Sequence, residues 1–186
     1  APRTPLQQLT FQGGVRPGAW DETSGWLSYE VSGPAGGQQL FAVDPDSGAT
    51  RQLTDAPGVG HHWGQWTPDE NGFLCTANER DSSVFDLVHV TECDRTRLYE
   101  HNHDSRITPV GWEPSEAQLL IHETHANGHQ GLAVVDTETE SLTRLTGGAD
   151  DHRSQLRSLQ PSPDGDAVYV ITERDRDRRG VYRVCL

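Results

Sequence analysis

The sequence predicts an all-β protein, namely a β-propeller of about four blades with four antiparallel strands in each. Three observations lead to this fold class. Trp20, Trp66 and Trp112 recur 46 residues apart, and Pro161 holds the matching place in a fourth unit. Short β-rich segments follow each of these residues, and no stretch has an apolar period typical of a helix. A period of about 45 residues built from four short strands is the range of propeller blades.

Each unit contains the same elements in the same order. A turn rich in Asp, Pro and Gly comes directly after the Trp or Pro: WDETSG, WTPDENG, WEPSEAQ and PSPDGD. One β-rich strand follows (WLSYEV, FLCTAN, LLIHET, VYVITE), and after a polar loop comes another (QLFAVD, DLVHVT, GLAVVD, GVYRVC). The final strand ends in Leu-Thr at 50–54 and 142–146, and TRLYE at 96–100 keeps its place in the second unit.

The repeat units span roughly 11–54, 55–99, 100–146 and 147–186. Residues 1–10 are predicted to be the final strand of another blade, because LQQLT at 6–10 matches the Leu-Thr ending, whereas the fourth unit lacks a final strand. Either the N-terminal strand completes the fourth blade and closes the ring, or the chain is part of a ring of six to eight blades. The larger ring is favoured because closed four-bladed rings are rare. Open blade edges also predict self-association.

Charge and composition exclude some function classes. The net charge is −13, with 28 acidic and 15 basic residues, so a nucleic acid would be repelled at long range. The longest apolar runs, such as VYVI, are far shorter than the roughly 20 residues of a membrane span, and no membrane segment is predicted. Three cysteines without a Cys-x-x-Cys spacing predict neither a disulfide framework nor a zinc site, which fits a reducing cytoplasm. Cys75 and Cys185 lie in apolar strands and are predicted to be buried and inert.

The repeats resemble those of two groups of known propellers. LFAVDPDSGATRQLTDAP followed by WTPDENG resembles TolB-type repeats, in which a strand ends in Asp and a tight turn, Leu-Thr and Trp-Ser-Pro-Asp-Gly follow. QPSPDGDAVYVITERDRDRRGVYRV resembles the N-terminal propeller of prolyl oligopeptidase family serine peptidases, especially their acylaminoacyl-peptidase and dipeptidyl-peptidase branch. The TolB-type resemblance covers essentially the whole chain.

The peptidase resemblance implies a propeller that caps an α/β-hydrolase domain of the same parent chain and restricts which peptides reach its active site. The catalytic Ser, Asp and His of that family lie in the hydrolase domain, and no Gly-x-Ser-x-Gly elbow occurs in this sequence. We therefore expect no catalytic residue and no cofactor in this chain, and a hydrolase domain and a peptide as partners. The alternative is a stand-alone TolB-like propeller that acts as a protein-binding scaffold.

Two groups of residues are candidates for binding a peptide. His61 and His62 lie just before Trp66, in the strand that lines the central channel of a propeller, although packing between neighbouring strands also explains them. Glu79-Arg80 and Glu173-Arg174 fall at matching loops of units two and four. The peptidase resemblance implies that such loops face the hydrolase domain, where an Arg fork can hold the carboxylate of a peptide. The alternative for 174–179 is a run of charged side chains that is simply exposed to solvent.

Two segments contain residue types that can bind a metal, but neither is expected to do so. His122, His125 and His129 give a His-x2-His-x3-His spacing, which can place imidazoles on one metal. The segment is predicted to be a strand followed by a loop, so a solvated hairpin loop explains it better than a zinc site. The acidic turn at 44–48 resembles the start of a calcium loop, but Ala49 stands where that loop needs glycine.

Overall fold

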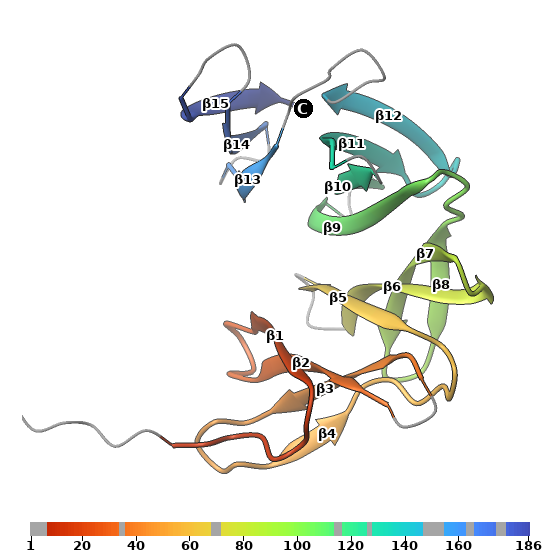
Figure 1. The fold of residues 1–186 in the computed structure, drawn as a ribbon, viewed down its shortest axis with the longest axis vertical. Coiled ribbons are helices and arrows are strands. Elements are labelled where there is room, and N and C mark those ends of the chain that lie inside the picture. Colours follow the sequence, from red (N-terminus) through yellow and green to blue (C-terminus); the bar gives the residue numbers. More distant parts are fainter. Residues whose placement is uncertain are drawn as a thin grey trace, which may run out of the picture.

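The computed structural model describes residues 7–33, 36–67, 72–113, 117–125, 128–146, 155–162, 166–173 and 178–186. The described residues form strands, turns and loops, with no helix among them, and so none long and apolar enough to cross a membrane. The strands build four antiparallel sheets, which are the four blades of a propeller (Figure 1). The predicted fold class is confirmed.

The first three blades each contain four described strands, and the fourth contains three. Blade 1 consists of β1 (Val15–Trp20), β2 (Leu27–Ser32), β3 (Gln38–Val43) and β4 (Thr50–Gln52). Blade 2 consists of β5 (His61–Trp66), β6 (Gly72–Asp81), β7 (Val84–Thr91) and β8 (Arg95–Tyr99). Blade 3 consists of β9 (Ser105–Glu113), β10 (Gln118–His125), β11 (Gln130–Asp136) and β12 (Ser141–Thr146). Blade 4 consists of β13 (Arg157–Pro161), β14 (Ala167–Thr172) and β15 (Gly180–Cys185).

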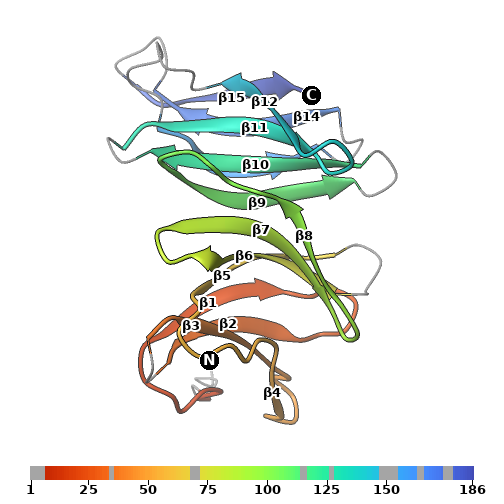
Figure 2. The same cartoon turned by 90° about the vertical axis from the view of Figure 1, so that its right-hand side faces the viewer.

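The strands pair in chain order within each blade, from the innermost strand to the outermost. Because neighbouring strands are antiparallel, the loops between the second and third strands lie on the same face of the arc as the links between blades. We call this face the connection face. The turns between the third and fourth strands lie on the opposite face, the turn face, and Figure 2 shows the blades from the side.

Adjacent blades pack through apolar flanks, as expected from strands that alternate their side chains between two sides. Blades 1 and 2 share a cluster around Leu40, Trp63 and Phe73. Blades 2 and 3 meet around Leu87 and Ile107, and further clusters of this kind continue to blade 4. The core of the protein is therefore a series of interfaces between sheets.

The innermost strands approach each other closely between blades 2 and 3. A Cβ atom built on Gly64 in β5 would lie 2.2 Å from Cγ of Pro109 in β9 and 2.7 Å from the carbonyl oxygen of Leu74. Real Cβ contacts are never so short, so the position accepts only glycine unless the strands separate.

The four blades form an open arc, with blade 1 at one end and blade 4 at the other (Figure 1). Residues 7–10, predicted as the final strand of another blade, lie outside any strand, at the opposite end of the arc from β15. They do not complete blade 4, because the width of the arc separates them from its open edge. An open arc is consistent with the predicted larger ring.

The prediction for Cys185 was wrong, whereas Cys75 is buried as expected. Cys75 lies in the cluster between blades 1 and 2, where burial raises the pKa of its thiol to about 12. Cys185 is exposed because it lies on β15, at the open end of the arc. The apolar strand pattern did not reveal that no described blade packs against this flank of β15.

Shortening a side chain at the interface between blades should destabilise the whole arc. We expect Leu87→Ala to lower the free energy of unfolding by about 2–5 kcal/mol, because it removes buried methyl groups and leaves a cavity. Denaturant unfolding followed by circular dichroism measures this change. Thr50→Ala on the exposed strand β4 is the control and should change it by less than about 0.5 kcal/mol. Equal effects of the two changes would contradict the flank-packing account.

Candidate functional site

Four of the six predicted site residues lie towards the connection face of blade 2. His61 and His62 begin β5, and Glu79 and Arg80 lie near the end of β6. The antiparallel pairing places His61 opposite Ala77, so the start of β5 and the end of β6 are neighbours. The structure therefore places these two strand ends side by side, although they are 17 to 19 positions apart in the sequence.

His61 is fully buried and does not line an open channel. Its Nε2 lies 3.1 Å from Nη2 of Arg95, and its Nδ1 lies 3.3 Å from the carbonyl oxygen of Gln38 in blade 1. A guanidinium only donates hydrogen bonds, so Nε2 is the acceptor and Nδ1 carries the proton. Burial and the charge of Arg95 lower the pKa of His61 to about 4. His61 is therefore a neutral residue that joins the two blades.

Arg95 links His61 to Glu79. Its Nη1 lies 2.8 Å from Oε1 of Glu79, while Nη2 contacts His61. Arg95 lies on β8, the outermost strand of blade 2, and was not predicted from the sequence. The only available signal was the alternation of Arg95 and Arg97 in DRTRLY, which has no meaning until β8 is paired with β7.

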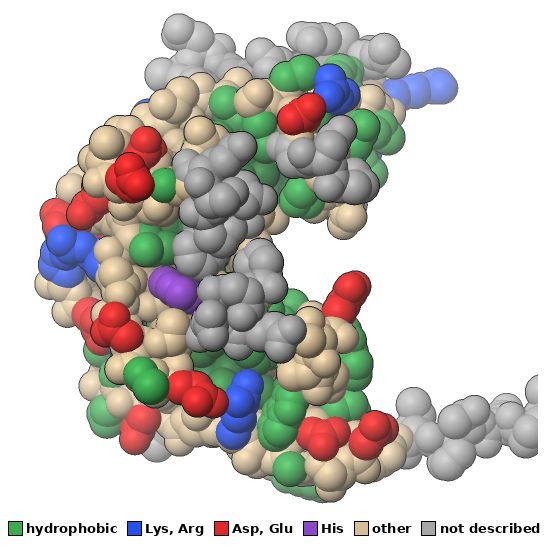
Figure 3. Space-filling model, turned by 180° about the vertical axis from the view of Figure 1, so that it is seen from behind, with side chains coloured by type: hydrophobic (Ala, Val, Ile, Leu, Met, Phe, Trp, Pro, Cys, Tyr) green, Lys and Arg blue, Asp and Glu red, His purple; other side chains and the backbone are tan. Residues whose placement is uncertain are grey.

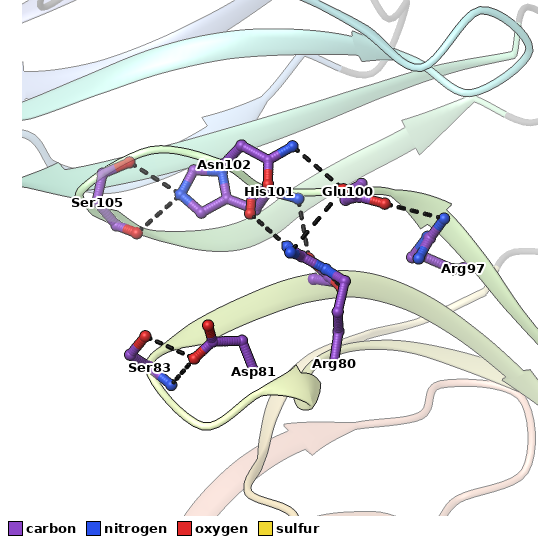
Figure 4. A network of polar contacts seen from close by, with 9 residues as sticks. Arg80, Asp81, Ser83, Arg97, Glu100, His101, Asn102 and Ser105 are labelled. Carbon is purple, nitrogen blue, oxygen red and sulfur yellow. Dashed lines mark hydrogen bonds and ion pairs between the residues drawn. The ribbon is translucent and has the colours of Figure 1, made fainter.

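Arg80 is held by a carboxylate of the next strand. Its Nε and Nη2 donate to the two carboxylate oxygens of Asp86, at 3.0 and 2.9 Å, which also raises the pKa of the guanidinium. Nη2 donates in addition to the carbonyl oxygen of His101 at 2.8 Å, and the backbone N–H of His101 donates to Asp86 at 2.9 Å. Figure 4 shows Arg80 facing His101 and Glu100, in the link between blades 2 and 3.

The polar network continues into blade 3. Nε2 of His101 lies 2.8 Å from the carbonyl oxygen of Ser105, and the Ser105 hydroxyl donates to Oε1 of Glu123 at 3.4 Å. Glu123 is fully buried, and Arg144 donates to both of its oxygens, at 2.9 and 3.1 Å. Buried charges need partners of this kind. The network fixes the orientation of blade 3 relative to blade 2.

A cavity of about 270 Å³ opens beside these groups on blade 2. Its lining residues are Ala77, Glu79, Arg80, Asp86, Val88, Arg95 and Arg97. Three guanidinium groups thus meet two carboxylates in a protein of strongly negative net charge. Arg97 is the most exposed of the three, and its Nη2 forms an ion pair with Oε2 of Glu100 at 3.2 Å. The arrangement can bind a carboxylate through a planar guanidinium fork.

His62 lies closer to solvent than His61. Its Nδ1 is 3.6 Å from Oε2 of Glu30, and the other oxygen of Glu30 accepts a 2.7 Å hydrogen bond from the backbone N–H of Trp63. Burial acts to raise the pKa of Glu30, but the hydrogen bonds from His62 and Trp63 outweigh it and leave the pKa below its usual value. Glu30 is therefore a carboxylate that ties blade 1 to the innermost strand of blade 2.

The matching residues of unit four are placed differently. Glu173 pairs with Arg179 at 2.8 Å, and both side chains are about half exposed. Arg174 lies outside the described residues. Glu173 thus stays in solvent, whereas Arg80 of unit two is anchored by Asp86. Unit four lacks this anchor because Gly180 begins β15 where blade 2 has Asp86 in β7.

His122, His125 and His129 do not form a metal site in the part of the chain that the structure describes. His122 lies within β10, where burial lowers its pKa although a hydrogen bond with Gln130 acts in the opposite direction. The backbone N–H of His125 donates to the carbonyl oxygen of His129 at 2.8 Å, which closes the hairpin. Their spacing therefore reflects a strand and a turn.

A larger, open groove of about 1120 Å³ lies between blades 1 and 2 near the turn face. Trp66 and Phe73 contribute aromatic surface, and Arg51 and Asp21 contribute charge. Arg51 stacks over the ring of Trp26, with 4.9 Å between its Cζ and the ring centroid. None of the site residues predicted from the sequence lines this groove.

These features define a β-propeller scaffold with a network of buried ion pairs on its connection face. Solved structures with a similar fold include TolB from Acinetobacter baumannii, with 18% identity, a TM-score of 0.65 and coverage of 95% of this chain and 42% of that one. An oligogalacturonate lyase from Vibrio parahaemolyticus has 12% identity and a TM-score of 0.66, over 92% of this chain and 48% of that one.

A prolyl endopeptidase structure, from a study of inter-domain dynamics in catalysis and specificity, has 18% identity and a TM-score of 0.64. The match covers 95% of this chain and 28% of that one. The chain thus spans less than half the length of these three proteins, and at such identities the likeness shows the fold alone. Neither a protein-family model nor a curated protein sequence matches the chain.

Burial of neutral His61 should make stability depend on pH. Its folded pKa of about 4 lies below the ordinary 6.5, so the unfolded chain takes up the proton first as the pH falls. Neutral His61 makes its full contribution to the free energy of unfolding above pH 6.5, and this contribution declines between pH 6.5 and about 4. We expect His61→Gln to flatten the fall in unfolding free energy over this range, as measured by urea unfolding at several pH values. Parallel curves for the two proteins would show that His61 is not the titrating group.

Removing Asp86 should cost far more than removing Glu173. Asp86→Ala leaves Arg80 and the His101 N–H without their acceptor, and we expect a loss of about 3 kcal/mol in unfolding free energy. Glu173→Ala breaks an exposed ion pair and should change stability by less than about 1 kcal/mol. Thermal unfolding of both variants measures the difference. Similar losses would contradict the placement of the two residues.

Proposed function

We propose that this chain is the propeller portion of a serine peptidase of the prolyl oligopeptidase type, and that it gates peptide access and helps to bind the peptide. The peptide bond would be cleaved in a separate α/β-hydrolase domain of the same parent protein. The fold likeness to a prolyl endopeptidase over 95% of the chain supports this proposal. The cytoplasmic location expected from the cysteines is part of it.

The observation that carries the proposal is the arginine-lined cavity on the connection face. Arg80 and Arg95 are held in place by Asp86 and Glu79, so their guanidinium groups lose little conformational freedom when a ligand binds. Arg97 is the most exposed of the three and can turn towards the cavity. A carboxylate is the group that such a fork recognises, at the terminus or on an acidic side chain of a peptide.

The chemistry assigned to these residues is binding and positioning. Arg97 would donate hydrogen bonds to the carboxylate of the peptide, and Arg95 would contribute positive charge from the wall of the cavity. Ala77 and Val88 form an apolar floor, which lowers the local dielectric and strengthens these contacts. The network through His101 would keep Arg80 in the same orientation whether or not a peptide is bound.

Peptides with a free carboxylate should bind this chain more tightly than amidated ones. We expect Arg97→Gln to weaken the binding of a short peptide with a free C-terminal carboxylate about tenfold. Amidation of that peptide should remove most of the affinity that its carboxylate contributes. Isothermal titration calorimetry measures both effects. Arg51→Gln near the turn face is the matched control, because it removes the same charge away from the cavity.

Equal affinity for free and amidated peptides, with no effect of Arg97→Gln, would contradict the proposed site. The isolated chain should also fail to hydrolyse blocked aminoacyl or dipeptidyl substrates. Serine-dependent turnover by this chain alone would overturn the assignment of catalysis to another domain.

The second candidate is a stand-alone TolB-like scaffold that binds a folded protein. The TM-score of 0.65 to TolB over 95% of the chain favours it. This candidate predicts no discrimination between free and amidated short peptides. The calorimetric comparison therefore separates the two functions.

A further inference from the structure

Three guanidinium groups line the cavity on the connection face, but they differ in how many of their nitrogens already have a partner. Arg95 uses Nη1 on Glu79 and Nη2 on His61. Its Nε is buried and has no hydrogen-bond partner among the described residues. Both terminal nitrogens of Arg95 are therefore engaged, so this residue gives a ligand its positive charge rather than an unoccupied nitrogen.

Arg80 keeps one terminal nitrogen unoccupied. Its Nε and Nη2 donate to Asp86, and Nη2 also donates to the carbonyl oxygen of His101. Its Nη1 lies 3.9 Å from Oε1 of Glu100, which is close enough for an ion pair but too long for a hydrogen bond. Because Asp86 fixes the other edge of the guanidinium, Nη1 is held in place without a strong acceptor.

Glu100 bridges Arg80 and Arg97 from the link that follows β8. Its Oε2 is 3.2 Å from Nη2 of Arg97, while its Oε1 faces Nη1 of Arg80, and Figure 4 shows the carboxylate between the two guanidinium groups. The side chain of Asn102 donates to Oε1 at 3.4 Å, a long hydrogen bond. A carboxylate of the protein itself thus lies at the nitrogens that are available to a ligand.

This carboxylate is loosely held. The side chain of Glu100 is 36% exposed and that of Arg97 is 45% exposed, and ion pairs between such exposed groups are weak because water and salt screen them. Asp86, the other carboxylate on Arg80, is only 5% exposed, and its departure would leave a buried charge without a partner. Glu100 is therefore the carboxylate that can leave Arg80 and Arg97 at little cost.

We propose that Glu100 is a built-in competitor for the carboxylate of the peptide, which binds in its place between Arg80 and Arg97. The inference rests on the proposed function and assigns the position of the ligand within that site. When the peptide binds, Arg97 releases Glu100, whose side chain turns into solvent. The peptide carboxylate then accepts hydrogen bonds from Nη1 of Arg80 and from the guanidinium of Arg97.

The exchange favours a ligand with one carboxylate. One negative charge leaves the two guanidinium groups and one arrives, so the balance of charge in the site is kept. A peptide amide brings no charge that replaces Glu100, and it cannot accept hydrogen bonds as strongly as a carboxylate does. Glu100 therefore sets a threshold that a peptide with a free carboxylate passes and an amidated peptide does not.

A test must separate this local competition from general repulsion, because the chain has a net charge of −13. Acidic side chains are spread over the face of the arc that Figure 3 shows, and removing any of them weakens the long-range repulsion of an anion. Asp104→Asn is the matched control for this effect. Asp104 is exposed, lies in the same link as Glu100, and forms no ion pair with the residues that the structure describes.

Isothermal titration calorimetry with the complete 186-residue chain tests the proposal, with N-acetylated trialanine and its C-terminal amide as the two ligands. We expect Glu100→Gln to tighten binding of the free carboxylate about three- to fivefold, which is the effect of removing one exposed ion pair. Asp104→Asn should change this affinity less than about twofold. Neither substitution should change the binding of the amide by more than that.

A double-mutant cycle with Arg97→Gln shows whether Glu100 acts through Arg97. In a chain that already carries Arg97→Gln, we expect Glu100→Gln to change the affinity less than about twofold, because the guanidinium that Glu100 occupies is gone. Both side chains are partly exposed, so the single and double variants should keep the fold, which circular dichroism and thermal unfolding check.

The outcomes distinguish the competitor role from the proposed function. If neither the wild type nor Glu100→Gln prefers the free carboxylate to the amide, the proposed function fails and the inference fails with it. If the wild type shows the preference but Glu100→Gln does not increase the affinity, only the competitor role is overturned. Equal gains from Glu100→Gln and Asp104→Asn would overturn it as well, and so would a full gain from Glu100→Gln in the absence of Arg97.

Discussion

The packing of one sheet flank against the next is the interaction on which the rest of this structure depends. A four-stranded antiparallel sheet has two faces, and in this chain both carry apolar side chains, so a single blade cannot bury them alone. Leu40 and Leu87 become inaccessible only because the following blade covers them. Every blade is thus stabilised by its neighbours, and the two ends of the series are the places where burial is incomplete.

The ion pairs on the connection face depend on this packing. Asp86 and Glu123 are buried carboxylates, and polar groups in such places need hydrogen-bond donors around them, which arginine side chains and a backbone N–H supply here. Their partners are Arg80 on β6, Arg144 on β12, Ser105 on β9 and the backbone of His101 in the link between blades 2 and 3. The same network that compensates these charges also orients Arg80 beside the cavity. Structural and binding roles are therefore carried by one set of residues.

The architecture could be read from the chain because it is repetitive. Tryptophans 46 residues apart, the turns that follow them and the Leu-Thr endings each report a local feature that recurs in every unit. The candidate site was predicted less completely. Glu79 and Arg80 were found because they stand at a loop, but Asp86 and Arg95, which hold them, come from strands whose charged residues look like ordinary solvated positions. His61 was expected to line a channel and is instead enclosed between two blades.

The sequence by itself determined the repeat, the order of the strands and the flank to which most side chains belong, because these follow from turn chemistry and from the two-residue alternation of a strand. Only the tertiary structure decided which charged groups meet and which apolar positions have a neighbour. Arg95 reaches His61 across the twist of blade 2, and Val181 is exposed although Leu87 at the same place is not. These outcomes depend on how neighbouring blades pack against each other, and the sequence of a single repeat does not specify that packing.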